Sequence, residues 1–113
     1  MRPDVPKWLD DIRDSAAYIL AATQDESVES YEANRTLRQA VERNFEIIGE
    51  AVNRIRRSER DVAERLGDLR QIIAFRNVLI HGYDYIDVEI VWRVIQARLP
   101  ELLRTVEDLL RGI

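Results

Sequence analysis

Residues 34–57 read NRTLRQAVERNFEIIGEAVNRIRR, the longest stretch of this chain with a regular apolar periodicity. Its apolar side chains recur every three or four residues, which is the spacing of one face of an α-helix. The stretch therefore predicts a long amphipathic helix whose apolar face must pack against other helices. We expect its buried stripe to consist of Leu37, Val41, Asn44, Ile48, Ala51 (or Val52) and Ile55.

Asn44 is the polar member of this stripe. A buried side-chain amide must find hydrogen-bond partners. We expect Asn44 either to tie neighbouring helices together or to reach a functional site, and we prefer the first interpretation.

The segment before the long helix has the same spacing. Pro6 fits the first turn of a helix, and the polar residues 24–30 that follow this helix predict a short loop or a frayed turn. The inner face of this first helix is expected to be Val5, Leu9, Ile12, Ala16 and Ile19.

Three further helical segments are predicted after the long helix. A short helix over residues 59–66 ends near Gly67, and a helix over residues 69–80, capped by Asp68, stops near Gly82. Asp87 resembles the N-cap of the last helix, within which Pro100 should cause a kink or a new start. The expected buried residues of this last helix are Ile90, Val94, Leu102, Val106 and Leu109.

The composition fits a single domain, residues 1–113, folded as an all-α up-and-down bundle of four main helices plus one short helix. Apolar residues make up 46% of the chain, which is enough for a real core. The chain has no cysteine, so disulfides, thiolate metal sites and cysteine nucleophiles are excluded. No apolar run approaches the roughly 20 residues that span a bilayer, and the first residues lack the apolar stretch of a signal peptide. We therefore expect a cytoplasmic protein that does not contact a membrane.

The charge of the chain argues against a general nucleic-acid coat, because the net charge is −4. Of the 17 basic residues, only Lys7 is not an arginine. The densest arginine cluster is Arg54, Arg56, Arg57 and Arg60. This cluster is either a solvated helix face interleaved with acidic residues, the more ordinary interpretation, or a contact for an RNA backbone.

Residues 76–83, RNVLIHGY, contain the only histidine of the chain and are the best candidate for chemistry. Histidine can change its charge near neutral pH, which suits a general base. Arginine offers a permanent charge and a planar fork of donors that matches a phosphate. Arg76 and His81 thus predict a site that acts on phosphodiesters, with Asn77 between them as a supporting polar residue.

Helical geometry separates the two main residues of this motif. Arg76 and His81 are five positions apart, so they point about 140° away from each other on one straight helix. Either the helix unwinds at Gly82, or two chains face each other across a two-fold axis and complete each other's sites. We prefer the symmetric dimer. From spacing alone, the more ordinary interpretation is that His81 is a favourable cap for the last carbonyls of its helix and that Tyr83 and Tyr85 are packing residues.

The surrounding sequence adds a family resemblance. Residues 76–83 are similar to the Arg-(x)4-His-x-Tyr signature of the HEPN superfamily, in its HepT-like toxin branch. Residues 43–51, RNFEIIGEA, resemble a second segment of that family, and residues 87–92 and 99–102 fit its final helix. The matching stretches occur in the expected order between residues 35 and 113, whereas residues 1–34 match only in helical character and length.

The resemblance implies a metal-independent ribonuclease toxin that forms a homodimer and needs no cofactor. In such a site, His81 would take the proton of a 2′-hydroxyl, Arg76 would hold the phosphate, and Asn77 would orient His81 or contact a phosphate oxygen. The partner implied is a minimal nucleotidyltransferase antitoxin, which would neutralise the toxin by transferring AMP to Tyr83. Two other interpretations remain open: a non-catalytic helical binding partner of the nucleotidyltransferase, and a purely structural helical oligomer.

Overall fold

The computed structural model describes residues 1–82 and 86–112, and every regular element in that part of the chain is an α-helix. The helices are α1 (Val5–Thr23), α2 (Val28–Ala33), α3 (Arg35–Ser58), α4 (Arg60–Arg65), α5 (Leu69–His81), α6 (Val88–Ala97) and α7 (Leu99–Arg111). The predicted all-α bundle is confirmed.

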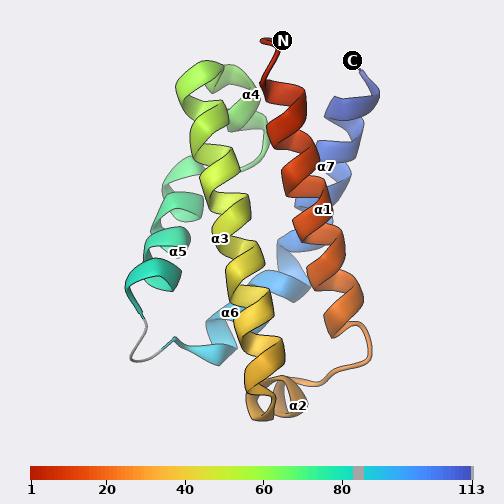
Figure 1. Ribbon diagram of the computed structural model, residues 1–113, viewed down its shortest axis with the longest axis vertical. Helices are drawn as coiled ribbons and strands as arrows, with labels where there is room; N and C mark the ends of the chain where they lie inside the picture. The colour runs from red at the N-terminus through yellow and green to blue at the C-terminus, as the bar shows by residue number, and fades with distance from the viewer. Residues whose placement is uncertain (83–85, 113) are drawn as a thin grey trace.

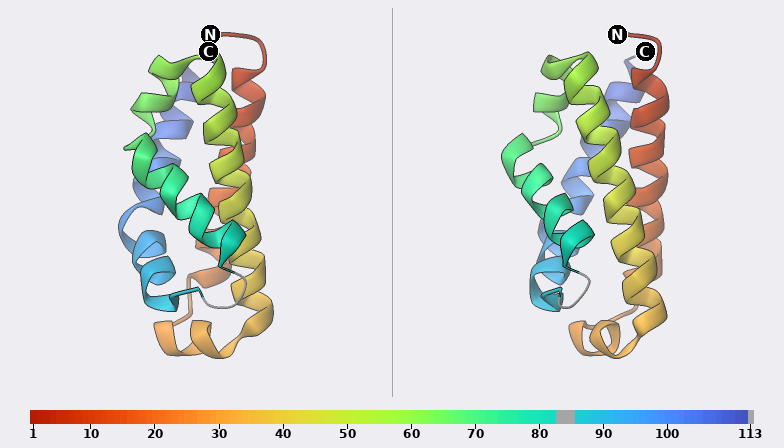
Figure 2. Two further views of the ribbon diagram at one scale, coloured as in Figure 1. Left: turned by 90° about the vertical axis from the view of Figure 1, so that its left-hand side faces the viewer. Right: turned by 60° about the vertical axis from the view of Figure 1, so that its left-hand side comes forward.

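The centre of the bundle is formed by α1, α3 and α7. The long helix α3 packs along α1, and α1 also packs along α7 (Figure 1). α1 begins and α7 ends at the same end of the molecule, while α2 lies across the other end (Figures 1 and 2). The predicted inner face of α1 is confirmed, because Val5, Leu9, Ile12, Ala16 and Ile19 are all fully buried.

The buried face of α3 differs from the prediction at two positions, Asn44 and Leu37. Phe45, not Asn44, is buried, and it packs edge-to-face on Phe75 of α5 with ring centroids 5.1 Å apart. Asn44 is half-buried and its amide donates to the Ala40 carbonyl at 2.8 Å, within the same helix. The preferred role for Asn44 was therefore wrong, because the local carbonyl satisfies its amide. Leu37 is also only half-buried, whereas Val41, Ile48, Ala51, Val52 and Ile55 are buried as predicted.

The loop expected around residues 24–30 is partly helical. Ser27 caps α2, and Ser27 and Ser30 bond to each other's backbone amides in a capping box. This short helix buries Tyr31, which packs on Trp92 of α6. A polar stretch that carries its own cap therefore forms a helix once one aromatic side chain reaches the core.

Pro100 starts a new helix, as one of the two expected outcomes. The break separates α6 from α7, and proline lies in the first turn of α7, where its missing N–H costs no hydrogen bond. The buried stripe of α6 is shifted by one position from the predicted one. Ile90 is 46% exposed, whereas Val91 and Ile95 are buried. In α7, Val106 and Leu109 are buried as predicted, and Leu102 is half-buried.

α5 is the helix that carries the motif, and it packs mainly against α3, to which it is inclined (Figure 2). Gly67 precedes it with a φ of 143°, a backbone region that L-residues avoid. Asp68 caps it as predicted, because the Asp68 carboxylate accepts from the backbone N–H groups of Arg70 and Gln71. Across the described residues, no helix is both long and apolar enough to cross a membrane.

Candidate functional site

The three motif residues within the described part of the chain lie on α5, toward its C-terminal end. Asn77 and His81 are exposed to solvent, and His81 is the last residue of the helix before Gly82. The side chain of Arg76 is only 24% exposed. The motif thus combines a partly enclosed cation with an amide and an imidazole at the surface.

Arg76 is enclosed because α5 approaches α3 very closely at Gly49. A Cβ atom added at Gly49 would lie 2.8 Å from both Cβ and Cδ of Arg76, a distance at which atoms clash. Only glycine leaves room here, so the stem of Arg76 lies directly on the α3 backbone. The Gly49 position therefore fixes how near the motif helix can come to the long helix.

The head of Arg76 is held by the next residue of α3. Arg76 Nη2 donates to Glu50 Oε2 at 2.7 Å, across 26 residues of sequence. The second oxygen, Glu50 Oε1, lies 3.4 Å from Nε of Arg54, one turn further along α3. One carboxylate therefore holds two guanidinium groups, and its side chain stays 39% exposed. Arg76 Nε is buried and has no hydrogen-bond partner among the described residues.

Gly49 and Glu50 are functional candidates that sequence reasoning did not single out. In the sequence, residues 43–51 carry only a family resemblance. Their spacing says nothing about Arg76, because the contact joins two helices whose relative placement depends on the whole bundle. A glycine inside a long helix is the one local signal, since it costs about 1 kcal/mol against alanine unless a close approach requires it.

The described part of the chain does not bring Arg76 and His81 together. It contains no hydrogen bond or ion pair that joins either residue to the other or to Asn77. Tyr83, the expected modification site, lies outside the described residues, as does Tyr85.

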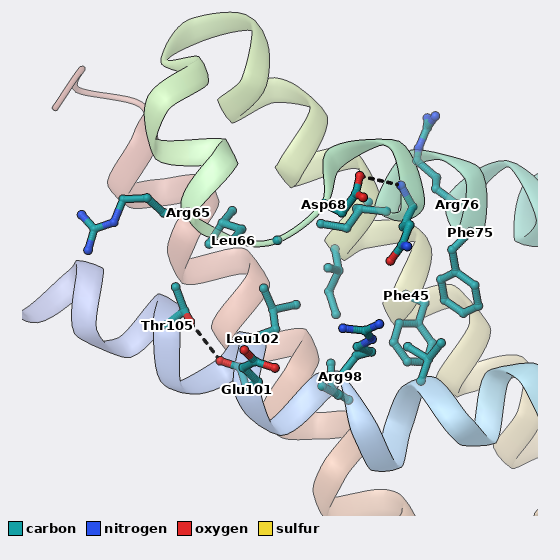
Figure 3. A pocket seen from close by; sticks show the side chains of 17 residues that line it. Phe45, Arg65, Leu66, Asp68, Phe75, Arg76, Arg98, Glu101, Leu102 and Thr105 are labelled. Atoms are coloured by element: carbon teal, nitrogen blue, oxygen red, sulfur yellow. Dashed lines mark hydrogen bonds between the residues drawn. The ribbon is translucent and has the colours of Figure 1, made fainter.

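A cavity of about 260 Å³ lies behind the motif helix, between α3, α5 and the start of α7. Phe45 and Phe75 point into it, and Arg98 reaches over it from the junction of α6 and α7 (Figure 3). The head of Arg76 points away from this cavity (Figure 3). Neither Asn77 nor His81 lines it. Arg76 contributes to the lining of the cavity, whereas Asn77 and His81 lie on the outer surface of α5.

A polar hollow of about 570 Å³ lies near Gly82, beyond the C-terminal end of α5. It is formed between the first part of α3 and the start of α6. Glu42 and Arg38 of α3 line it on one side, and Asp87 and Glu89 line it on the other. Burial raises the pKa of the Glu42 carboxyl; Arg38 opposes this shift and Glu46 adds to it. In the ranges 1–82 and 86–112, no group of three or more histidine or acidic side chains is arranged to hold a metal ion.

Comparison with known proteins gives consistent results. A family model described as "Ribonuclease HepT-like" matches residues 12–109. The "Putative RNase MJ1380" of Methanocaldococcus jannaschii is 33% identical over 106 residues, covering 92% of this chain and 94% of that protein. No solved structure matches the chain.

Two further relatives come from other organisms. The "Putative RNase TTE0752" of Caldanaerobacter subterraneus is 28% identical, with 92% of both chains covered. The "Probable ribonuclease HepT" of Thermococcus cleftensis is 28% identical over 90% of this chain and 92% of that protein. Because the family match spans most of the helical bundle, including the α3–α5 contact and the motif, this chain belongs to the HepT-like ribonuclease family of the HEPN superfamily.

Proposed function

We propose that this chain is a metal-independent endoribonuclease that serves as the toxin of a toxin–antitoxin pair in the cytoplasm. The observation that carries this proposal is the placement of the motif: Arg76 is held by Gly49 and Glu50, while Asn77 and His81 are exposed on the same helix. A fixed cation and an accessible imidazole on one surface helix suit a long polyanion that cannot enter a closed pocket. The names of the relatives support RNA as that polyanion.

The mechanism that we propose uses the nucleophile of the substrate. His81 takes the proton of a ribose 2′-hydroxyl, and the 2′-oxygen forms a bond to the adjacent phosphorus. The bond from phosphorus to the 5′-oxygen breaks, and that oxygen takes a proton from water. Arg76 binds the phosphate and offsets the charge that grows in the transition state. Asn77 orients His81 or donates to a phosphate oxygen. DNA lacks the 2′-hydroxyl and should not be cleaved.

A homodimer is the assembly that we propose for this site. The offset of about 140° between Arg76 and His81 on a straight helix keeps them from closing on one phosphate within one chain. α5 ends at His81 in helical form, so the described part of the helix does not unwind to bring them together. Val78 and Ile80, at 51% and 38% exposure, add apolar surface to this helix. A two-fold axis next to α5 would cover that surface and pair Arg76 of each chain with His81 of the other.

The regulatory partner that we propose is a minimal nucleotidyltransferase antitoxin. It would transfer AMP from ATP to the hydroxyl of Tyr83 and release pyrophosphate. Tyr83 is seven residues after Arg76 and two after His81 in sequence. The added phosphate would compete with RNA for Arg76, and the nucleotide would obstruct the substrate path.

The decisive experiment is cleavage of a panel of RNAs in EDTA by the wild-type protein, His81→Ala and Arg76→Ala. We expect wild-type cleavage and a loss of 10²-fold or more in each variant, because general-base and charge-stabilising groups are typically worth that much. Circular dichroism should show that each variant keeps its helical content. Full cleavage by a folded His81→Ala protein would reject the enzyme and leave the non-catalytic partner of a nucleotidyltransferase.

A further inference from the structure

We infer that the RNA site extends from α5 onto α3, where Arg54 binds a second phosphate and Glu50 is the positioning residue that holds Arg54 and Arg76 together. This inference rests on the proposed ribonuclease function. It assigns roles to two side chains outside the motif, both on the long helix.

The first ground is the way Glu50 divides its two oxygens. Oε2 accepts from Arg76 at 2.7 Å, and Oε1 faces Nε of Arg54 at 3.4 Å. Two guanidinium groups that share one carboxylate must lie near each other. Because the three groups carry two positive charges and one negative charge, the cluster keeps one net positive charge after its internal pairing. That excess charge fits an additional anion.

The second ground is exposure. The Arg54 side chain is 53% exposed and uses only Nε toward Glu50. Its other guanidinium N–H groups make no hydrogen bond to the described protein residues, so they are free to bind a phosphate oxygen. Arg57 lies three residues further along the same helix face, is also exposed, and belongs to no ion pair in the described chain. The chain thus offers guanidinium groups along a line that begins at Arg76.

The third ground is the different depth of the two arginines. Arg76 is mostly enclosed and has a fixed stem, whereas Arg54 is on the open surface. An enclosed, oriented arginine suits the reacting phosphate, where charge changes during the reaction. An exposed surface arginine suits a neighbouring phosphate, whose charge does not change. Arg54 should therefore contribute to RNA binding, while Glu50 should contribute to the rate through Arg76.

Binding of a single-stranded RNA oligonucleotide tests the role of Arg54. The measurements use the His81→Ala background, which prevents cleavage, over a series of salt concentrations. We expect Arg54→Ala to weaken binding several-fold and to reduce the slope of log K against log salt by about 0.7, the value for one lost phosphate contact on a single strand. Arg104→Ala removes an arginine of α7 that is also exposed and should change neither quantity.

Steady-state kinetics test the role of Glu50. Glu50→Gln keeps the shape of the side chain but removes the charge that fixes Arg76, so we expect kcat to fall about tenfold or more. RNA should bind as tightly or more tightly, because one negative charge has been removed from its site. Glu46→Gln is the matched control, since Glu46 lies one turn earlier on α3 and pairs only with Arg43. A merely structural role for Glu50 would lower the melting temperature without separating kcat from KM.

The outcomes separate this inference from the proposed function. If wild type cleaves RNA and Arg54→Ala has the salt slope of Arg104→Ala, the second phosphate contact is rejected while the ribonuclease stands. If Glu50→Gln has the kcat of Glu46→Gln, the positioning role is rejected. If wild type neither binds nor cleaves any RNA of the panel, the proposed function itself fails.

Discussion

The side chain of Arg76 packs through its apolar stem and binds an acidic group through its guanidinium head. Its stem covers the α3 backbone at Gly49, and its head is held by Glu50. Arginine suits this double use because its long apolar stem packs well while its fork binds anions. The placement of Arg76 therefore depends on Gly49, a residue that has no side chain.

Substitution of Gly49 should disturb the site without touching the motif. In Gly49→Ala the new methyl group would overlap Arg76 Cβ, which cannot move without α5, so we expect a loss of about 1–3 kcal/mol in unfolding free energy. RNA cleavage should fall as well, because Arg76 is displaced. Urea denaturation and cleavage assays measure both effects. Gly112→Ala is the control, since its nearest contact would be an ordinary 3.6 Å and its φ is −78°. Equal stabilities of the two variants would contradict the close approach.

Tyr83 should be the residue through which the antitoxin acts. Tyr83→Phe keeps the ring but removes the hydroxyl that would accept AMP, so the variant should stay toxic in the presence of the nucleotidyltransferase. Tyr85→Phe should still be neutralised. Mass spectrometry after incubation with the partner and ATP locates the added AMP. A mass gain on Tyr85, or on no tyrosine, would refute this prediction.

α5 is anchored mainly on one side, by α3, and a cavity lies behind it. Its position therefore depends strongly on its own end contacts. Asp68 fixes the first turn through two backbone N–H groups. A helix that carries the proposed catalytic side chains but has few other contacts should respond to the loss of this cap in both stability and activity.

The variant Asp68→Ala tests this dependence. We expect it to lose about 1 kcal/mol of stability, the usual value of an N-cap, and to cleave RNA more slowly because α5 frays from its start. Asp68→Asn keeps a capping oxygen and should retain nearly all of both. Thermal melts and initial rates give the comparison. If Asp68→Asn were as impaired as Asp68→Ala, the charge rather than the cap would be responsible.

Glu42 of α3, which lines the hollow near Gly82, should make the stability of the fold depend on pH. Burial raises the pKa of Glu42, so the folded protein binds its proton more tightly than the unfolded chain does. The ionised carboxyl therefore destabilises the fold above its folded pKa, and this penalty disappears as the pH falls below the unfolded value of about 4.3. Glu42→Gln should raise the melting temperature at pH 7 and have little effect at pH 4. An equal rise at both pH values would exclude ionisation as the cause.

At the scale of the whole molecule, the proposed homodimer means that one chain alone would be an incomplete site. If Arg76 of one chain serves His81 of another, a mixture of Arg76→Ala and His81→Ala proteins should recover part of the activity. One of the two sites in each mixed dimer then contains both intact groups. The measurement is RNA cleavage by mixed dimers, isolated through two different affinity tags. No recovery in such dimers would favour a site within one chain, and a monomer in light scattering would exclude the model.

Much of the architecture follows from local patterns. The inner face of α1, the caps Asp68 and Asp87, and an interruption at Pro100 were all predictable, although the sequence left open whether Pro100 kinks one helix or starts another. They depend on apolar spacing and on capping chemistry within a few residues. The errors have a common cause. Phe45 replaced Asn44, and Val91 replaced Ile90, because the facing helix decides which side of a broad apolar stripe is covered.

The candidate site, too, is predictable from the sequence in one respect and visible only in the tertiary structure in another. The residue types of the motif, an arginine, an amide and a histidine on one helix, are present in the linear sequence, since chemistry depends on which groups the chain carries. The seating of Arg76 on Gly49 and Glu50 is visible only in three dimensions. These residues are separated by 26 positions, and their contact depends on the packing of α5 across α3, which no periodicity within either helix specifies.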